Sequence, residues 1–94
     1  MPRVVIWSPD ADLAYLEILE FIVDNISSKA ASNLNNEVEK QLDILVEFPH
    51  RWPISNETGL RKAVVKQHYL IIYRVHPQYI EIADFIDTRS DHSY

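Results

Sequence analysis

The spacing of apolar residues predicts a short strand, two helices and three further strands. Residues 4–7 are all β-branched or aromatic, a composition typical of a strand that is buried on both faces. Apolar or alternating runs predict the three later strands at residues 60–66, 69–75 and 79–86. Only two or three residues separate these later runs. Connections this short join antiparallel neighbours, so the three strands are predicted to form a meander.

Helical spacing begins directly after the first strand. Ser8 is a favourable N-cap residue, and Pro9 follows at the first helical position, where its missing N–H costs nothing. Apolar residues then recur at helical spacing and predict one core-facing stripe, made of Tyr15, Leu16, Leu19, Ile22, Val23 and Ile26. The pair Asp24-Asn25 weakens the pattern and predicts the end of this helix.

A second helix follows after a short joint. Ser27 or Ser28 can cap its start, and Phe48-Pro49 ends it, because a residue before proline avoids the helical region. One face of this helix is apolar and carries Ala31, Leu34, Val38, Leu42 and Leu45. Two amphipathic helices with a short joint predict an antiparallel hairpin that packs on a flat surface.

The expected order of elements is therefore β-α-α-β-β-β. It predicts an α+β fold, in which an N-terminal strand and an antiparallel three-stranded meander carry the helical hairpin on one face of the sheet. The segment before the meander contains Pro53, Asn56 and Gly59 and is expected to be a loop. Because the chain has 94 residues, we expect one domain over residues 1–94.

Charge is unevenly distributed along a chain whose net charge is −5. Residues 1–59 hold four Lys and Arg against ten Asp and Glu, whereas residues 60–89 hold five against three. The whole chain is therefore not expected to be drawn strongly to nucleic acid, although its C-terminal half can present a local basic surface.

The composition argues against several classes of function. The chain has no cysteine, which excludes disulfides and thiolate metal sites and fits a reducing cytoplasm. Its histidines, His50, His68, His76 and His92, show no zinc-binding spacing, so no metal is expected. There is no glycine-rich phosphate loop, so no cofactor is expected either. Neither a signal peptide nor a membrane-spanning run is recognisable, and we expect a cytoplasmic protein.

Four segments, in order, resemble the RelE/ParE superfamily of toxins. "W-S-P-D-A-D-L" resembles the family's first helical start, and "G-L-R-K-A-V-V-K" resembles its second strand. "H-Y-L-I-I-Y-R-V" is similar to the central strand, and "I-E-I-A-D-F-I-D-T-R" to the last strand, which ends in an arginine. The resemblance covers essentially the whole chain. It implies a type II toxin that inhibits growth and that a cognate antitoxin holds silent.

The resemblance implies two alternative targets. The ParE-like branch, that of plasmid stabilisation modules, poisons DNA gyrase by protein–protein contact and needs no catalytic residues. The acidic net charge, the long leucine-rich hairpin and the ending "D-T-R-S-D" favour this branch. The RelE-like branch cleaves messenger RNA on the ribosome without a metal. A third interpretation is a chain that has lost its toxicity and only binds the antitoxin.

In the RelE-like alternative, the resemblance implies a catalytic set of Arg61, Arg89, His92 and Tyr94. The arginines would contact phosphate and stabilise the phosphorane, while His92 or Tyr94 would transfer protons. Lys66 or His68 would supply an additional proton-handling group.

The arginines of the predicted strands also have a structural interpretation. Arg61, Arg74 and Arg89 lie in or at the ends of strands, where burial of an arginine is costly unless it is paired. Asp84 and Asp87 are available partners, so salt bridges are an alternative to phosphate binding.

The antitoxin is expected to cover hydrophobic surface on the hairpin or at a sheet edge with an ordered helix or strand. We expect the first helix, residues 8–26, and the last strand to make much of this contact.

Overall fold

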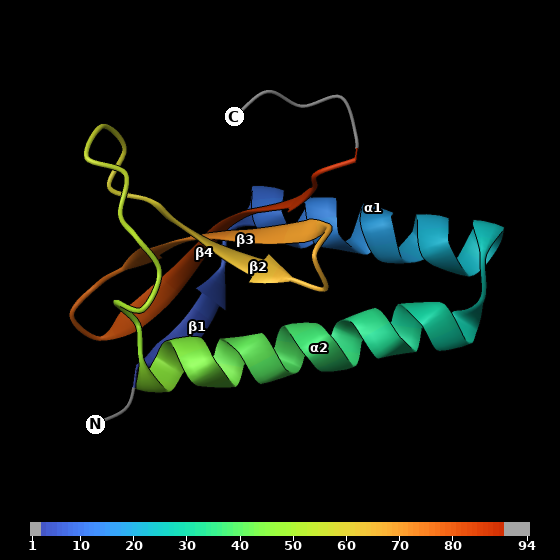
Figure 1. The fold of residues 1–94 in the computed structure, drawn as a ribbon, viewed down its shortest axis with the longest axis horizontal. Coiled ribbons are helices and arrows are strands. Elements are labelled where there is room, and N and C mark those ends of the chain that lie inside the picture. Colours follow the sequence, from blue (N-terminus) through green and yellow to red (C-terminus); the bar gives the residue numbers. More distant parts are fainter. Residues whose placement is uncertain (1–2, 90–94) are drawn as a thin grey trace.

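The computed structural model describes residues 3–89 and confirms the predicted order of elements. In chain order they are β1 (Val4–Trp7), α1 (Pro9–Asn25), α2 (Ser28–Glu47), β2 (Arg61–Val65), β3 (Tyr69–Val75) and β4 (Tyr79–Asp87). The four strands form one sheet in the order β1-β4-β3-β2. The two helices run antiparallel, and their connection lies beyond the end of the sheet (Figure 1).

The C-terminal meander has the predicted antiparallel pairing. Val65 pairs with Tyr69 across a three-residue turn, in which Lys66 and Gln67 have positive φ angles of 51° and 68°. β1 joins this meander as an edge strand parallel to β4. The first and last strands in sequence, β1 and β4, are therefore neighbours in the sheet, and the helical hairpin connects β1 to β2.

Both helix starts are capped as the sequence predicts. Ser8 Oγ accepts from the Ala11 N–H at 3.1 Å, and Ser27 Oγ accepts from the Ala30 N–H at 3.0 Å. Each bond satisfies one main-chain donor that the first turn of a helix leaves unpaired. α2 ends at Glu47, one residue before the predicted Phe48-Pro49 stop.

The core lies between the hairpin and one face of the sheet. The predicted apolar face of α2 is confirmed, because all five of its residues are buried. Ile71 and Tyr73 of β3 and Ile80 and Ile82 of β4 are fully buried in the same cluster. The alternation of side chains along a strand therefore directs one face of β3 and β4 at the helices.

The prediction that the first strand is buried on both faces is wrong. Val5 and Trp7 pack against the core, whereas Val4 and Ile6 are 60% and 49% exposed. β1 is an edge strand, and Val4 and Ile6 point to the face opposite the helices. A run of β-branched residues is compatible with burial of one face or of both, and it does not distinguish them.

The predicted stripe on α1 is too broad. Tyr15 and Ile22 are buried, but Leu16, Val23 and Ile26 are exposed. Only a narrow stripe of α1 reaches the core, and apolar residues on both sides of it remain in contact with solvent. No helix within residues 3–89 is long and apolar enough to span a bilayer.

Candidate functional site

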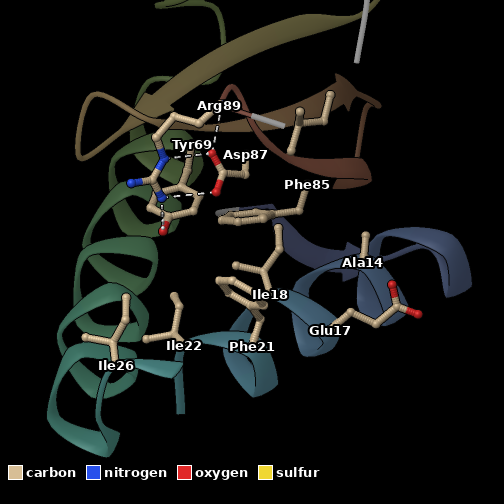
Figure 2. Close-up of a pocket in the computed structure, with 11 residues that line it drawn as sticks. Ala14, Glu17, Ile18, Phe21, Ile22, Ile26, Tyr69, Phe85, Asp87 and Arg89 are labelled. Carbon is tan, nitrogen blue, oxygen red and sulfur yellow. Dashed lines mark hydrogen bonds and ion pairs between the residues drawn. The ribbon is translucent and has the colours of Figure 1, made fainter. Parts of the chain in front are cut away.

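A groove with a volume of about 370 Å³ lies between α1 and the C-terminal half of β4. Its lining comes from one flank of α1 and from the sheet residues that face it: Ala14, Glu17, Ile18, Phe21, Ile22 and Ile26 from the hairpin, and Tyr69, Phe85, Ile86, Asp87 and Arg89 from the sheet. Figure 2 shows the helical side chains on one side and Tyr69, Phe85, Asp87 and Arg89 on the other. The lining is mostly apolar, with charged side chains at its rim.

The helical wall of the groove exposes large apolar side chains. Phe21 is 63% exposed and Ile26 is 68% exposed. Full burial of a phenylalanine is worth roughly 1.5–3 kcal/mol, so these positions favour a partner that covers them. α1 also carries five acidic residues and no basic residue between Pro9 and Asn25. The wall therefore suits a partner surface that is apolar and flanked by positive charge.

The floor of the groove rests on a cluster of aromatic rings. Phe85 lies 4.6 Å from Tyr15 and 5.9 Å from Tyr69, measured between ring centroids, and Trp7 stacks on Tyr15 at 5.2 Å. The Tyr15 hydroxyl donates to Asn35 Oδ1 at 2.8 Å and so ties α1 to α2. Burial, and then the nearby Glu39 carboxylate, raises the pKa of Tyr15 to about 12. These ring contacts and the bond to Asn35 fix the positions of the aromatic side chains beneath the groove.

Arg89 lies at the end of the groove and is held by two neighbours. Its Nε and one terminal nitrogen donate to the two carboxylate oxygens of Asp87 at 3.1 and 3.0 Å, and the same terminal nitrogen donates to the Tyr69 hydroxyl (Figure 2). The bond to Asp87 raises the pKa of Arg89. Burial favours the neutral carboxyl of Asp87, but the hydrogen bonds from Arg89 outweigh it and lower the pKa of Asp87. Of the carboxylates that the sequence offered as partners for the arginines, Asp87 therefore forms a salt bridge with Arg89.

Arg61 and Arg74 make structural bonds of another kind. Arg61 donates to the main-chain carbonyls of Trp52 and His50, and Arg74 donates to the carbonyl of Thr58 at 2.9 Å. Both arginines thus hold the loop between α2 and β2 against the sheet, and they bind carbonyls where the sequence suggested carboxylates.

The structure does not bring the two arginines of the proposed nuclease set together. Arg61 pairs with Tyr73 in the sheet, whereas Arg89 binds the hydroxyl of Tyr69. Tyr73 and Tyr69 are four residues apart on β3, about 13 Å along the strand. The guanidinium groups of Arg61 and Arg89 point to different ends of the sheet, and each is engaged in intramolecular bonds.

The other residues proposed for the nuclease either lie in the turn between β2 and β3 or follow Arg89 in the sequence. Lys66 lies in that turn, and the His68 carbonyl accepts from the N–H and hydroxyl of Thr88. His92 and Tyr94 lie outside the described residues. Within residues 3–89, no group of three or more His, Cys, Asp or Glu side chains is placed to hold a metal ion.

The residues that build the groove were mostly missed from the sequence. Ile18 and Phe21 fall outside the predicted stripe, and Tyr69 and Phe85 were assigned only to the strands. One available signal was Phe21 itself, because a large aromatic next to Glu20 on the polar flank of a helix has no core to bury it.

A helical hairpin on a small mixed sheet, with an apolar groove at one edge, defines a domain suited to a protein partner. Residues 5–92 match the model of a family described as the ParE toxin of the type II toxin–antitoxin system parDE. A chain of the chromosomal ParDE system from P. aeruginosa has a similar fold, with a TM-score of 0.75 and 17% sequence identity. The match covers 90% of this chain and 95% of that chain. No curated protein matches the sequence.

The family match spans nearly the whole chain, and this chain therefore belongs to the ParE toxin family of type II toxin–antitoxin systems. Membership in this family implies an antitoxin as its partner.

Proposed function

We propose that this chain, when free of its antitoxin, stops growth in the cytoplasm by inhibiting DNA gyrase. The observation that carries this proposal is the ParE family match over residues 5–92. Inhibition of this kind works by protein–protein contact, so a net charge of −5 and the separate intramolecular bonds of Arg61 and Arg89 are compatible with it.

The alternative of RNA cleavage finds less support in the site. A metal-independent nuclease needs positive groups that converge on one phosphate. Arg61 and Arg89 instead bind separate parts of the chain, and the groove beside Arg89 is mostly apolar. These bonds favour structural roles for both arginines.

We further propose that the antitoxin binds the groove between α1 and β4. This assignment agrees with the expectation from the sequence that the first helix and last strand make the contact. The exposed Phe21 and Ile26 supply apolar area, and the acidic surface of α1 supplies charge for a basic rim on the partner.

The target is tested by pulse labelling of DNA and protein synthesis within minutes of inducing this chain alone. We expect DNA synthesis to stop first while translation continues. Purified toxin should also block supercoiling by purified gyrase. An early stop in translation, with DNA synthesis persisting, would contradict the gyrase proposal.

The Arg61→Ala, Arg89→Ala double variant separates the two targets further. A variant that folds, as judged by circular dichroism, should still stop DNA synthesis if gyrase is the target. Loss of growth inhibition in the folded variant would favour RNA cleavage instead. The Arg61→Lys, Arg89→Lys variant is the matched control, because it keeps both positive charges.

A further inference from the structure

Basic side chains are concentrated in one part of the chain. Residues 48–80 carry five Lys and Arg against one Glu, a balance of +4, whereas the rest of the chain carries four Lys and Arg against thirteen Asp and Glu, a balance of −9. The five cations are Arg51, Arg61, Lys62, Lys66 and Arg74. The loop after α2, together with β2 and β3, is therefore a positive region in an acidic protein.

None of these five cations forms an ion pair with a carboxylate in the part of the chain that the structure describes. Lys40, His76 and Arg89 supply the cations of the ion pairs found there. Arg61 and Arg74 instead donate to main-chain carbonyls of the loop, which orient the two guanidinium groups without cancelling their charge. A guanidinium has five N–H donors, so most of those of Arg74 remain available to a ligand.

Lys62 and Arg74 are neighbours on the face of the sheet opposite the helices. Both side chains are exposed, whereas the adjacent Ala63 and Tyr73 are fully buried in the core, so the alternation of side chains directs Lys62 and Arg74 away from the hairpin. In the β2–β3 register the two are diagonal neighbours, a separation of about 7–8 Å. Glu81 of β4 pairs with Arg74, but its carboxylate is bonded to a histidine.

Arg51 adds a third exposed cation at the same end of β2. The carbonyls of the residues on either side of it both accept from Arg61, the first residue of β2. The loop that carries Arg51 lies at the end of the molecule opposite the connection between the helices (Figure 1). Arg61 is half-buried and positions this loop, whereas Arg51, Lys62 and Arg74 are exposed. We call these three exposed residues the basic surface.

The chemistry of the basic surface suits a phosphate backbone. Contacts to phosphate use arginine and lysine and need no apolar centre, whereas a stable protein interface has one. The large apolar side chains exposed on the loop and on β2 are Ile54 and Val64, and each is more than half covered. The balance of −9 elsewhere in the chain repels a polyanion, so such a ligand approaches by the basic surface. An inhibitor bound to gyrase lies beside DNA, the substrate of that enzyme.

We propose that Arg51, Lys62 and Arg74 contact the phosphate backbone of the DNA that gyrase holds when this toxin is bound to it. The inference rests on the proposal that gyrase is the target, and it adds a contact with DNA to the contact between the proteins. The acidic hairpin faces away from the duplex, so the basic surface also fixes the orientation of the toxin on the gyrase–DNA complex.

The test is the affinity of fluorescently labelled toxin for purified gyrase, measured by anisotropy with and without a duplex DNA that gyrase binds. We expect DNA to raise the affinity at low salt. Three phosphate contacts add about 2.7 to the slope of log affinity against log salt, so the gain from DNA should fall about 40-fold between about 50 and 200 mM salt.

Glutamine variants test the three side chains directly. Arg51→Gln, Lys62→Gln, Arg74→Gln should lose the gain from DNA and keep the affinity for gyrase alone, with folding checked by circular dichroism. Lys62→Gln by itself, at an exposed side chain, should lose about a third of the added salt slope. The control Lys29→Gln, Lys40→Gln removes two exposed cations from α2 and should keep the whole gain.

The outcomes separate this inference from the proposed target. Gyrase binding that DNA does not change, or a gain that survives in the triple variant, would overturn the DNA contact and leave gyrase as the target. Weaker binding of the folded triple variant to gyrase without DNA would assign the three cations to an acidic surface of gyrase, and it would also overturn the DNA contact. A toxin that binds gyrase under neither condition refutes the target and this inference together.

Discussion

The two helices of the hairpin have similar lengths but use their apolar residues differently. α2 buries its whole apolar face and exposes no large hydrophobic side chain between Ser28 and Glu47. α1 buries a narrow stripe and exposes Leu13, Leu16, Phe21 and Val23. α2, whose apolar and polar faces are separate, therefore uses its apolar residues to form the core. The helix with exposed apolar flanks forms one wall of the groove proposed for the antitoxin.

Truncation of one leucine in each helix tests this difference most directly. Leu45 of α2 is fully buried, and Leu45→Ala should lower the free energy of unfolding by about 2–5 kcal/mol. Leu16 of α1 is 52% exposed, and Leu16→Ala should cost less than about 1 kcal/mol. Urea denaturation of the two variants measures both values. Equal losses would show that α1 and α2 contribute alike to the core.

A second pair of variants separates the two flanks of α1. Phe21 lines the groove and Leu13 does not, although their exposed fractions are similar at 63% and 58%. Phe21→Ala should weaken antitoxin binding roughly 10- to 100-fold, as expected for an aromatic anchor. Leu13→Ala should leave affinity nearly unchanged. Titration calorimetry measures both, and equal effects would move the binding site away from the groove.

The sequence predicted the parts of the fold whose burial follows a strict period. The predictions of the buried α2 face and of the β2–β3–β4 meander were correct. In each case the apolar pattern is compatible with only one structural environment. The parallel pairing of β1 with β4 could not be predicted, since four apolar residues do not specify their neighbour. The same ambiguity produced the wrong burial of Val4 and Ile6.

The sequence indicated the elements that line the groove but not its individual residues. The first helix and last strand were expected to carry the antitoxin contact, and these elements line the groove. The individual residues were not found, because the groove depends on where β1 ends relative to β4, and this relation involves residues about 75 positions apart. The carbonyl partners of Arg61 depend in the same way on the path of a loop.

The bond that joins the two helices has an effect that depends on pH. Tyr15→Phe removes the hydrogen bond to Asn35 and should lower stability at neutral pH by about 1 kcal/mol. In the folded protein the pKa of Tyr15 is raised to about 12, above the unfolded value of about 10. This contribution is fully present below the unfolded pKa and is lost as pH rises through the folded one.

Thermal unfolding at several values between pH 8 and pH 12 measures that dependence. The stability difference between wild type and Tyr15→Phe should be constant up to about pH 9 and shrink above about pH 10. Tyr79→Phe is the control at a partly exposed ring. A difference that stays constant through pH 12 would contradict the raised pKa.

The smallest expected effect concerns the ion pair at the end of the groove. Arg89 is 55% exposed, so Asp87→Asn should lower stability at pH 7 by no more than about 1 kcal/mol. The pKa of Asp87 is lowered in the folded state, so its contribution is present above the unfolded pKa of about 4 and is lost as pH falls through the folded value. Urea denaturation at pH 7, 4 and 2 should therefore show the two proteins converging in acid. A gap that persists at pH 2 would assign the effect to packing rather than charge. A small gap at pH 7 would mean that the fold depends little on this exposed ion pair.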